Sequence, residues 1–166
     1  MAGRRPAAWN QWAEVVGREA RKPRFVGDMP HGWVASDFMR SLLDMFAYER
    51  ESDRSMVIAA GIPATWIEGG GIALEGLRTP WGTLGYSLRR ERSRVVLTVH
   101  PATRLPPGGL VFPWPLAEPP RCVRLQGREA RFEQGEIRIA SVPAQLVVDL
   151  AQACASFTRQ PAPASP

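Results

Sequence analysis

The side chains with the most chemical potential stand close to the start of the sequence. Trp9 and Trp12 lie three residues apart, and Trp33 follows after a charged loop. An indole plane suits the C–H face of a sugar ring, so these tryptophans are candidates for sugar binding. Glu14, two residues after Trp12, is one of the few acidic residues near this segment.

Each of these residues also has a purely structural interpretation. Trp9 and Trp12 repeat at helical spacing with Val16, which is typical of a buried helix face. His31 stands at the entry to a predicted helix between a proline and a glycine, where an ordinary loop histidine is as well accounted for as a sugar-binding one. The sequence leaves both interpretations open.

Two helices are expected to carry these candidates. The first spans about residues 8–20, and the second begins near residues 33–36 and ends near residues 49–51. The second helix has apolar residues at i, i+4, i+7 and i+8, which predicts burial along a broad side. This stripe comprises Phe38, Leu42, Met45 and Phe46.

Strand patterns replace the helical period after about residue 55. The clearest signal is the Thr-Pro-Trp-Gly turn at residues 79–82, in which Pro80 fixes φ and Gly82 accepts a positive φ. Apolar residues alternate on both sides of the polar stretch Arg89 to Arg94, which we expect to be the tip of a β-hairpin. Other short strands are expected at residues 56–60, 110–112, 122–125 and 146–148, with 130–132 pairing to 137–139 across a turn at 134–135.

Many short strands with regular turn signals are typical of an antiparallel sandwich. We therefore predict an α+β fold, in which a short N-terminal helical pair is followed by a predominantly antiparallel β-sandwich. The expected domains are a helical segment at residues 1–55, the sandwich at 56–150, and a disordered tail rich in Pro, Ala and Ser at 151–166. Two helices cannot bury both apolar faces, so they either pack on the sandwich or belong to a larger helical domain.

Charge and hydropathy argue against two classes of partner. The net charge of +5 is carried by arginines, with Lys22 the only lysine, and the arginines alternate with apolar residues instead of forming a tract. We interpret them as charge on solvated strand faces, so no nucleic-acid partner is expected. No apolar run reaches the ~18 residues of a membrane span, so no membrane partner is expected, and no secretory signal is visible.

The two cysteines give no sign of a metal or cofactor site. Cys122 and Cys154 follow no metal-ligand spacing, and no motif for another cofactor is present. Two buried or idle thiols are the favoured interpretation, and a disulfide is the alternative.

The order of motifs resembles one known architecture. A W-x-x-W segment begins at Trp9, His31 precedes a long helix, "GIP" stands at residues 61–63, and the hairpin "TPWGTLGYSLRRE" begins at Thr79. Over roughly residues 8–148 this resembles the C-terminal end of bacterial (α/α)-toroid glycosidases of the α-L-rhamnosidase type, and of relatives with discoidin (coagulation factor 5/8 type) domains. The resemblance implies that the last hairpin of a six-hairpin toroid leads into a C-terminal sandwich.

The resemblance also implies that this chain is not catalytically competent alone. The family pattern W-E-x-W has a catalytic Glu where this sequence has Asn10, and an amide cannot ionise to act as a base. Glu14 would project about one helical turn away. His31 matches a histidine that lines the sugar site of the family, and Trp33 could supply its aromatic neighbour. Glycoside hydrolysis needs two carboxyl groups, and the general acid of the family lies upstream of the matched segment.

We therefore expect the C-terminal portion of a carbohydrate-active, glycoside hydrolase-like protein. Its expected ligand in the complete protein is a carbohydrate, and its expected partner is the remainder of a helical domain or a second copy of the chain. The alternative is a free-standing β-sandwich module that binds carbohydrate or protein, favoured by the six tryptophans and the two unshielded helix faces.

Overall fold

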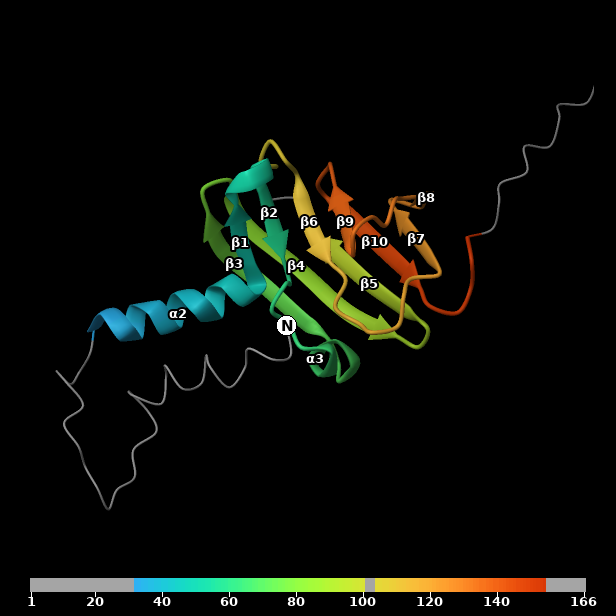
Figure 1. Cartoon of the computed structure of the whole chain (residues 1–166), viewed down its shortest axis with the longest axis horizontal. Coiled ribbons are helices and arrows are strands. Elements are labelled where there is room, and N and C mark those ends of the chain that lie inside the picture. The colour runs from blue at the N-terminus through green and yellow to red at the C-terminus, as the bar shows by residue number, and fades with distance from the viewer. Residues whose placement is uncertain (1–31, 101–103, 155–166) are drawn as a thin grey trace, which may run out of the picture. The chain divides into compact units, whose positions relative to one another are not determined.

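The structure, a computed structural model, describes residues 32–100 and 104–154 (Figure 1). The chain divides after Leu43 into two units, and the second contains all the described strands. The helices are α2 (Gly32–Phe46), α3 (Ala64–Glu68) and the short 3-10 helix η2 (Glu51–Asp53). The strands are β1 (Ala47–Arg50), β2 (Ser55–Ile58), β3 (Ile72–Thr79), β4 (Gly82–Glu91), β5 (Arg94–Val99), β6 (Leu110–Pro113), β7 (Cys122–Leu125), β8 (Arg128–Glu129), β9 (Glu136–Ile139) and β10 (Ala144–Asp149).

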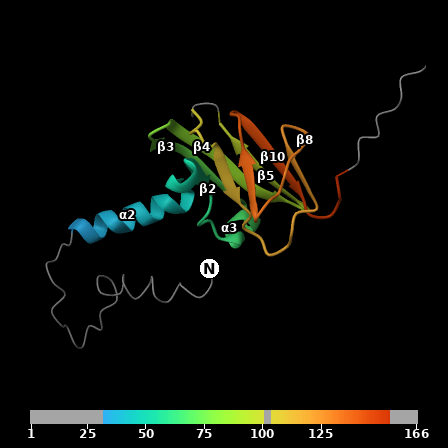
Figure 2. The same cartoon turned by 45° about the horizontal axis from the view of Figure 1, so that its top comes forward.

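The strands form two sheets that share one core (Figure 2). Sheet A has the order β1-β2-β6-β9, in which β2 and β6 run parallel and the other neighbours antiparallel. Sheet B has the order β3-β4-β5-β10-β7-β8 and is antiparallel throughout. This arrangement confirms the predicted α+β class with a predominantly antiparallel sandwich.

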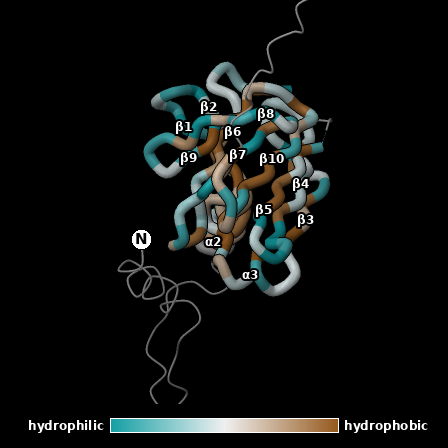
Figure 3. The backbone as a smooth tube through the Cα atoms, turned by 90° about the vertical axis from the view of Figure 1, so that its right-hand side faces the viewer, coloured by the Kyte–Doolittle hydropathy of each residue, from teal (hydrophilic) through white to brown (hydrophobic). Residues whose placement is uncertain are grey.

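The core follows from the alternation of apolar residues along the strands. Successive side chains of a strand point to opposite faces, so every second residue of each strand meets the other sheet. Figure 3 shows the hydrophobic segments concentrated on the strands where the sheets meet. The largest fully buried side chains include Met56 and Ile58 of β2, Leu110 and Phe112 of β6, Leu84, Tyr86 and Leu88 of β4, Leu97 of β5, Ile137 and Ile139 of β9, and Leu146 of β10.

Helix α2 ends at Phe46, before the predicted end at residues 49–51, because the following residues pair as β1 with β2. The carbonyl oxygen of Phe46 accepts hydrogen bonds from the Tyr86 hydroxyl at 2.9 Å and from the backbone N–H of Ala59 at 2.8 Å, so backbone pairing with the sandwich begins here. Gly61 permits the close approach of the two segments, since a Cβ at this position would lie 2.7 Å from the Cα of Met45. A second described α-helix, α3, follows the Gly61 contact and contains Trp66.

Strands β3, β4 and β5 form a three-stranded meander. The turn at Pro80–Trp81 joins β3 to β4 as predicted, and Gly82 has a φ of 111°, in the region expected for it. The tip between β4 and β5 is shorter than the predicted stretch from Arg89 to Arg94, because Arg89 and the next two residues continue the ladder opposite β5. Only Arg92 and Ser93 form the turn.

One predicted strand pairing is wrong. Strand β9, with Ile137 and Ile139, pairs with β6 in sheet A and not with residues 130–132. The predicted turn at residues 134–135 is present. The residues before this turn form only an isolated bridge, between Glu133 and Glu136. The physical reason is burial: joining sheet A places both isoleucines in the core, whereas Phe132 stays 37% exposed.

Candidate functional site

Most of the predicted site residues lie outside the part of the chain that the structure describes. Trp9, Asn10, Trp12, Glu14 and His31 precede residue 32, where the description begins. Trp33 belongs to the first turn of α2, and only its backbone is described. The sugar site that these residues would form therefore stays a prediction.

A cleft with an aromatic wall and charged residues in its lining lies at one edge of the sandwich, between β1, η2 and the β3–β4 turn. It has a volume of about 260 Å³. Its lining contains one indole, two carboxylates and two guanidinium groups. The residues are Glu49, Arg50, Glu51, Arg54, Ser55, Trp81 and Pro107, and we call this site the Trp81 cleft.

The position of Trp81 follows from the turn chemistry of its neighbours. The Thr79 hydroxyl donates to the carbonyl oxygen of Gly82 at 2.7 Å and accepts from the backbone N–H of Trp81 at 3.2 Å. These bonds brace a two-residue turn in which Pro80 has a fixed φ. The Trp81 indole is half-buried against the core, and its Nε1–H donates to Oε1 of Glu49 at 3.0 Å. The aromatic wall is therefore held from the backbone and from β1.

Arg54 contributes a cation to the same cleft from an unusual backbone conformation. Its φ of 54° and ψ of 35° lie in the left-handed region, where a non-glycine residue is strained. The carbonyl oxygen of Arg54 accepts from the N–H of Gly108 at 2.9 Å, which holds this conformation. No hydrogen bond or ion pair joins the Arg54 side chain to another described residue.

A charge network adjoins the cleft through Arg50 and Ser55. Arg50 pairs with Asp53 at 2.9 Å and with Glu136 at 2.7 Å, and Arg138 reaches the same Asp53 carboxylate at 2.8 Å. The buried Ser55 hydroxyl donates to Oδ1 of Asp53 at 2.6 Å. Hydrogen bonds from Arg50, then from Ser55 and Arg138, hold the pKa of Asp53 well below its usual range. Hydrogen bonds to Glu136 and Asp53 raise the pKa of Arg50 above its usual value.

These contacts suit binding better than catalysis. A carboxylate whose pKa is lowered is a weak proton acceptor, so Asp53 is poorly placed to activate the Ser55 hydroxyl that it holds. His100, the histidine in the described part of the chain, does not line the cleft. The cleft combines an indole ring with carboxylate acceptors and a guanidinium donor. Such a lining suits a small polar ligand.

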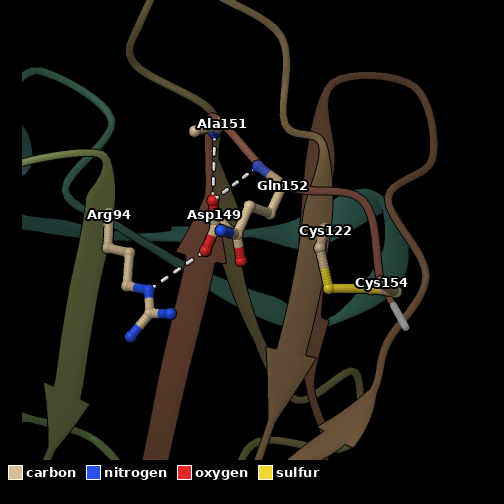
Figure 4. The surroundings of a disulfide bond; sticks show 6 residues. All are labelled: Arg94, Cys122, Asp149, Ala151, Gln152 and Cys154. Carbon is tan, nitrogen blue, oxygen red and sulfur yellow. Dashed lines mark hydrogen bonds and ion pairs between the residues drawn. A yellow bond between two sulfur atoms is a disulfide. The ribbon is translucent and has the colours of Figure 1, made fainter.

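A second, larger cleft lies beside the two cysteines, which form a disulfide (Figure 4). The expectation of two thiols is therefore wrong. Strand β7 and the segment after β10 bring Cys122 and Cys154 to a Cα–Cα distance of 4.8 Å, a proximity that sequence separation could not reveal. This cleft has a volume of about 360 Å³, and its lining includes Arg121, Glu129 and Phe132.

Asp149 fixes the segment that carries Cys154. Its Oδ1 accepts hydrogen bonds from the backbone N–H groups of Ala151 and Gln152, at 3.0 and 2.9 Å. Its Oδ2 accepts from Nε of Arg94 at 3.0 Å (Figure 4). The hydrogen bond from Gln152, above all, lowers the pKa of this buried carboxyl. The disulfide therefore forms part of the wall of the second cleft. This arrangement is more typical of a structural cross-link than of a ligand site.

The sequence pattern places Trp81 in a turn but does not identify it, Glu49 or Arg54 as site residues. The available signal was the Thr-Pro-Trp-Gly turn, which must project a large aromatic side chain at the end of two strands. Nothing in the sequence pattern places β1 and η2 opposite that turn. The cleft depends on contacts between segments about 30 residues apart, as the Trp81–Glu49 bond shows with its separation of 32.

Comparisons with known proteins identify no relative. No protein-family profile matches the chain, and no curated protein or solved structure matches it. Within residues 32–100 and 104–154, no three His, Cys, Asp or Glu side chains form a group that could hold a metal ion. None of the described helices is both long and apolar enough to cross a lipid bilayer.

Proposed function

We propose that this chain is the non-catalytic β-sandwich portion of a carbohydrate-active, glycoside hydrolase-like protein, and that α2 belongs to the helical part of that protein. The observation that carries the proposal is the apolar face of α2. Met39, Leu42 and Leu43 are 63%, 44% and 45% exposed. Three neighbouring large apolar side chains that are exposed to solvent indicate a surface for further protein contacts.

Further helices are the partner that best fits this face. The exposed residues recur at the spacing i, i+3 and i+4, which is the pattern of a helix that packs on other helices. The same helix is followed directly by β1, so a helical domain at this point would be continuous in sequence with the sandwich. The resemblance to the end of a toroid glycosidase supplies the carbohydrate class of substrate.

The size and activity of the native product test this proposal. An antibody against the sandwich would detect the product in the source cells and capture it for assay on a panel of aryl glycosides. We expect a polypeptide much larger than 166 residues that hydrolyses at least one glycoside, while the purified 166-residue chain hydrolyses none. A native product of 166 residues, or a large product without glycosidase activity, would overturn the proposal.

The alternative function is a free-standing sandwich module that binds carbohydrate or protein. The Trp81 cleft is the observation that favours it, because this cleft lies wholly within the sandwich and needs no helical partner. A native product of 166 residues that is retained on a polysaccharide column would support this alternative.

We also infer that the protein works in an oxidising compartment. Structural disulfides form and persist mainly where the redox environment is oxidising, and the Cys122–Cys154 bond joins two segments of the sandwich. Acid quenching of cells followed by thiol alkylation tests this inference. Both cysteines should escape alkylation unless a reductant is added first, and alkylation without a reductant would contradict the inference.

A further inference from the structure

We propose that the Trp81 cleft binds a single neutral sugar ring, which stacks on the Trp81 indole and hydrogen-bonds to Glu49, Glu51 and Arg54. The choice of a sugar as the ligand class rests on the proposed function. The location, size and polarity of the site rest on the sandwich alone.

The aromatic wall is fixed before any ligand arrives. Trp81 is packed against the core on one side, its backbone N–H is held by Thr79, and its indole N–H is held by Glu49. A rigid indole loses little conformational freedom on binding, and its face suits the C–H groups of a pyranose ring. The same Glu49 carboxylate retains further lone pairs that can accept a hydrogen bond from a ligand hydroxyl.

The charges favour a neutral ligand over an acidic one. Arg50 is already engaged by Asp53 and Glu136, so it adds no uncompensated positive charge. The remaining ionic groups of the cleft are the carboxylates of Glu49 and Glu51 and the guanidinium of Arg54. Two carboxylates and one guanidinium give these groups a net negative charge, which would repel a uronate or a phosphate. Sugar hydroxyls both donate and accept, so they can use all three groups.

The volume limits the ligand to about one ring. Cavities that hold drug-sized molecules measure about 300–1,000 Å³. The Trp81 cleft, at about 260 Å³, is smaller than this range and would hold one pyranose, the end or side branch of a glycan. So few contacts predict weak binding, with a Kd on the order of 1 mM.

Nitrogen-15 NMR of the 166-residue chain is the direct test, because each indole N–H gives its own signal. The probes are the methyl glycosides of D-glucose, D-galactose, D-mannose, L-rhamnose and D-xylose, with D-glucuronate as the acidic control. We expect at least one neutral glycoside to shift the Trp81 indole signal saturably. The Trp66 indole, 45% exposed on α3 and outside the cleft, should not move.

Matched variants connect the shift to the cleft. Trp81→Ala should weaken binding at least tenfold, measured on the backbone signals of Glu49 and Glu51, whereas Trp66→Ala should bind like the parent chain. If Trp81→Ala does not fold, Glu51→Gln is the second variant, and it should weaken neutral sugars several-fold. Arg54→Ala should do the same.

The results separate this inference from the proposed function. No saturable shift of the Trp81 indole with any neutral glycoside, or a stronger response to glucuronate, would overturn the cleft proposal whatever the native product proves to be. Saturable binding that Trp81→Ala abolishes would support it, even where the native product has 166 residues and the proposed function has failed.

Discussion

Arg50 and Glu136 stand on the two opposite edge strands of sheet A, yet their side chains meet at 2.7 Å. They alternate with core-facing residues, so they lie on the outer face of the sheet, the face that also bears Val57 and Val111. Both valines are fully buried although they lie outside the core cluster. We infer that the ion-pair network is the cover of this face, because long arginine side chains can shield apolar surface with their methylene groups.

This network predicts a specific loss of stability in acid. The pKa of Asp53 is lowered in the folded state, chiefly by Arg50, so the unfolded state binds more protons as the pH falls. The contribution of Asp53 to the free energy of unfolding is present above the ordinary carboxyl pKa of about 3.9 and is lost as the pH falls below it. Asp53→Asn should therefore be less stable than the parent chain at pH 7, and the difference should shrink below about pH 4.

Urea unfolding of both proteins over a range of pH measures this difference. The Asp149 carboxyl, whose pKa is also lowered, should add to the acid sensitivity of both proteins equally and so cancel from the comparison. A gap between Asp53→Asn and the parent chain that stays constant down to pH 2 would contradict the prediction.

The disulfide predicts a second, redox-dependent loss of stability. Cys122 and Cys154 are separated by 32 residues, and cross-linking a loop of this length restricts the unfolded chain. The chain-entropy relation gives a stabilisation on the order of 3–4 kcal/mol, and less where other effects intervene. A reductant should lower the Tm of the parent chain, as measured by circular dichroism. The double variant Cys122→Ser/Cys154→Ser should already have this lowered Tm, and reductant should not change it further. An unchanged Tm of the parent chain after confirmed reduction would refute the assigned stabilisation.

Local pattern predicted most of the sandwich, and long-range pairing accounts for what it missed. The Thr-Pro-Trp-Gly turn and the strands at residues 110–112 and 122–125 follow from turn chemistry and alternation, which are properties of neighbouring residues. The pairing of β9 with β6 does not follow from these local properties. Ile137 and Ile139 have the same alternation whether they pair with residues 130–132 or with β6, and only the burial available in sheet A decides between them.

The candidate site was less predictable than the fold. The residues singled out for chemistry precede residue 32, apart from Trp33, of which only the backbone is described, and the structure does not test their roles. The Trp81 cleft is lined by residues of β1, η2 and the β3–β4 turn. It forms only because α2 ends at Phe46, where β1 begins. A helix that continued to residues 49–51, as the sequence suggested, would have placed Glu49 on a helical surface. The early end follows from the pairing of β1 with β2, a tertiary contact that overrides the local helical pattern.

Gly108 provides a third prediction, about the backbone beneath the cleft. A Cβ at this residue would lie 2.2 Å from the carbonyl oxygen of Asp53 and 2.8 Å from the backbone nitrogen of Ser55. Backbone atoms cannot move aside as a flexible side chain can, so Gly108→Ala should cost about 3 kcal/mol in the free energy of unfolding. It should also shift the NMR signals of Arg54, whose carbonyl group accepts from the Gly108 N–H.

Gly127→Ala is the matched control for that substitution. Gly127 has a positive φ of 75°, and no other atom lies within 4 Å of the Cβ that alanine would add. Alanine at this position therefore introduces backbone strain but no steric clash. We expect a cost of about 1 kcal/mol and no change at Arg54. Equal destabilisation by the two alanines, measured by urea unfolding, would show that the close approach at Gly108 is unimportant.

The last prediction separates an exposed residue of α2, Leu42, from one that contacts the sandwich, Met45. Leu42 is 44% exposed, so Leu42→Glu should change the free energy of unfolding of the 166-residue chain by no more than about 0.5 kcal/mol. Met45 lies one turn later against Gly61, so Met45→Glu places a carboxylate at a close contact and should cost about 2 kcal/mol. If Leu42 contacts further helices in a larger native protein, Leu42→Glu should lower the Tm of that protein clearly while sparing the isolated chain. An equal and small effect in both proteins would mean that the exposed face of α2 is not a packing surface for those helices.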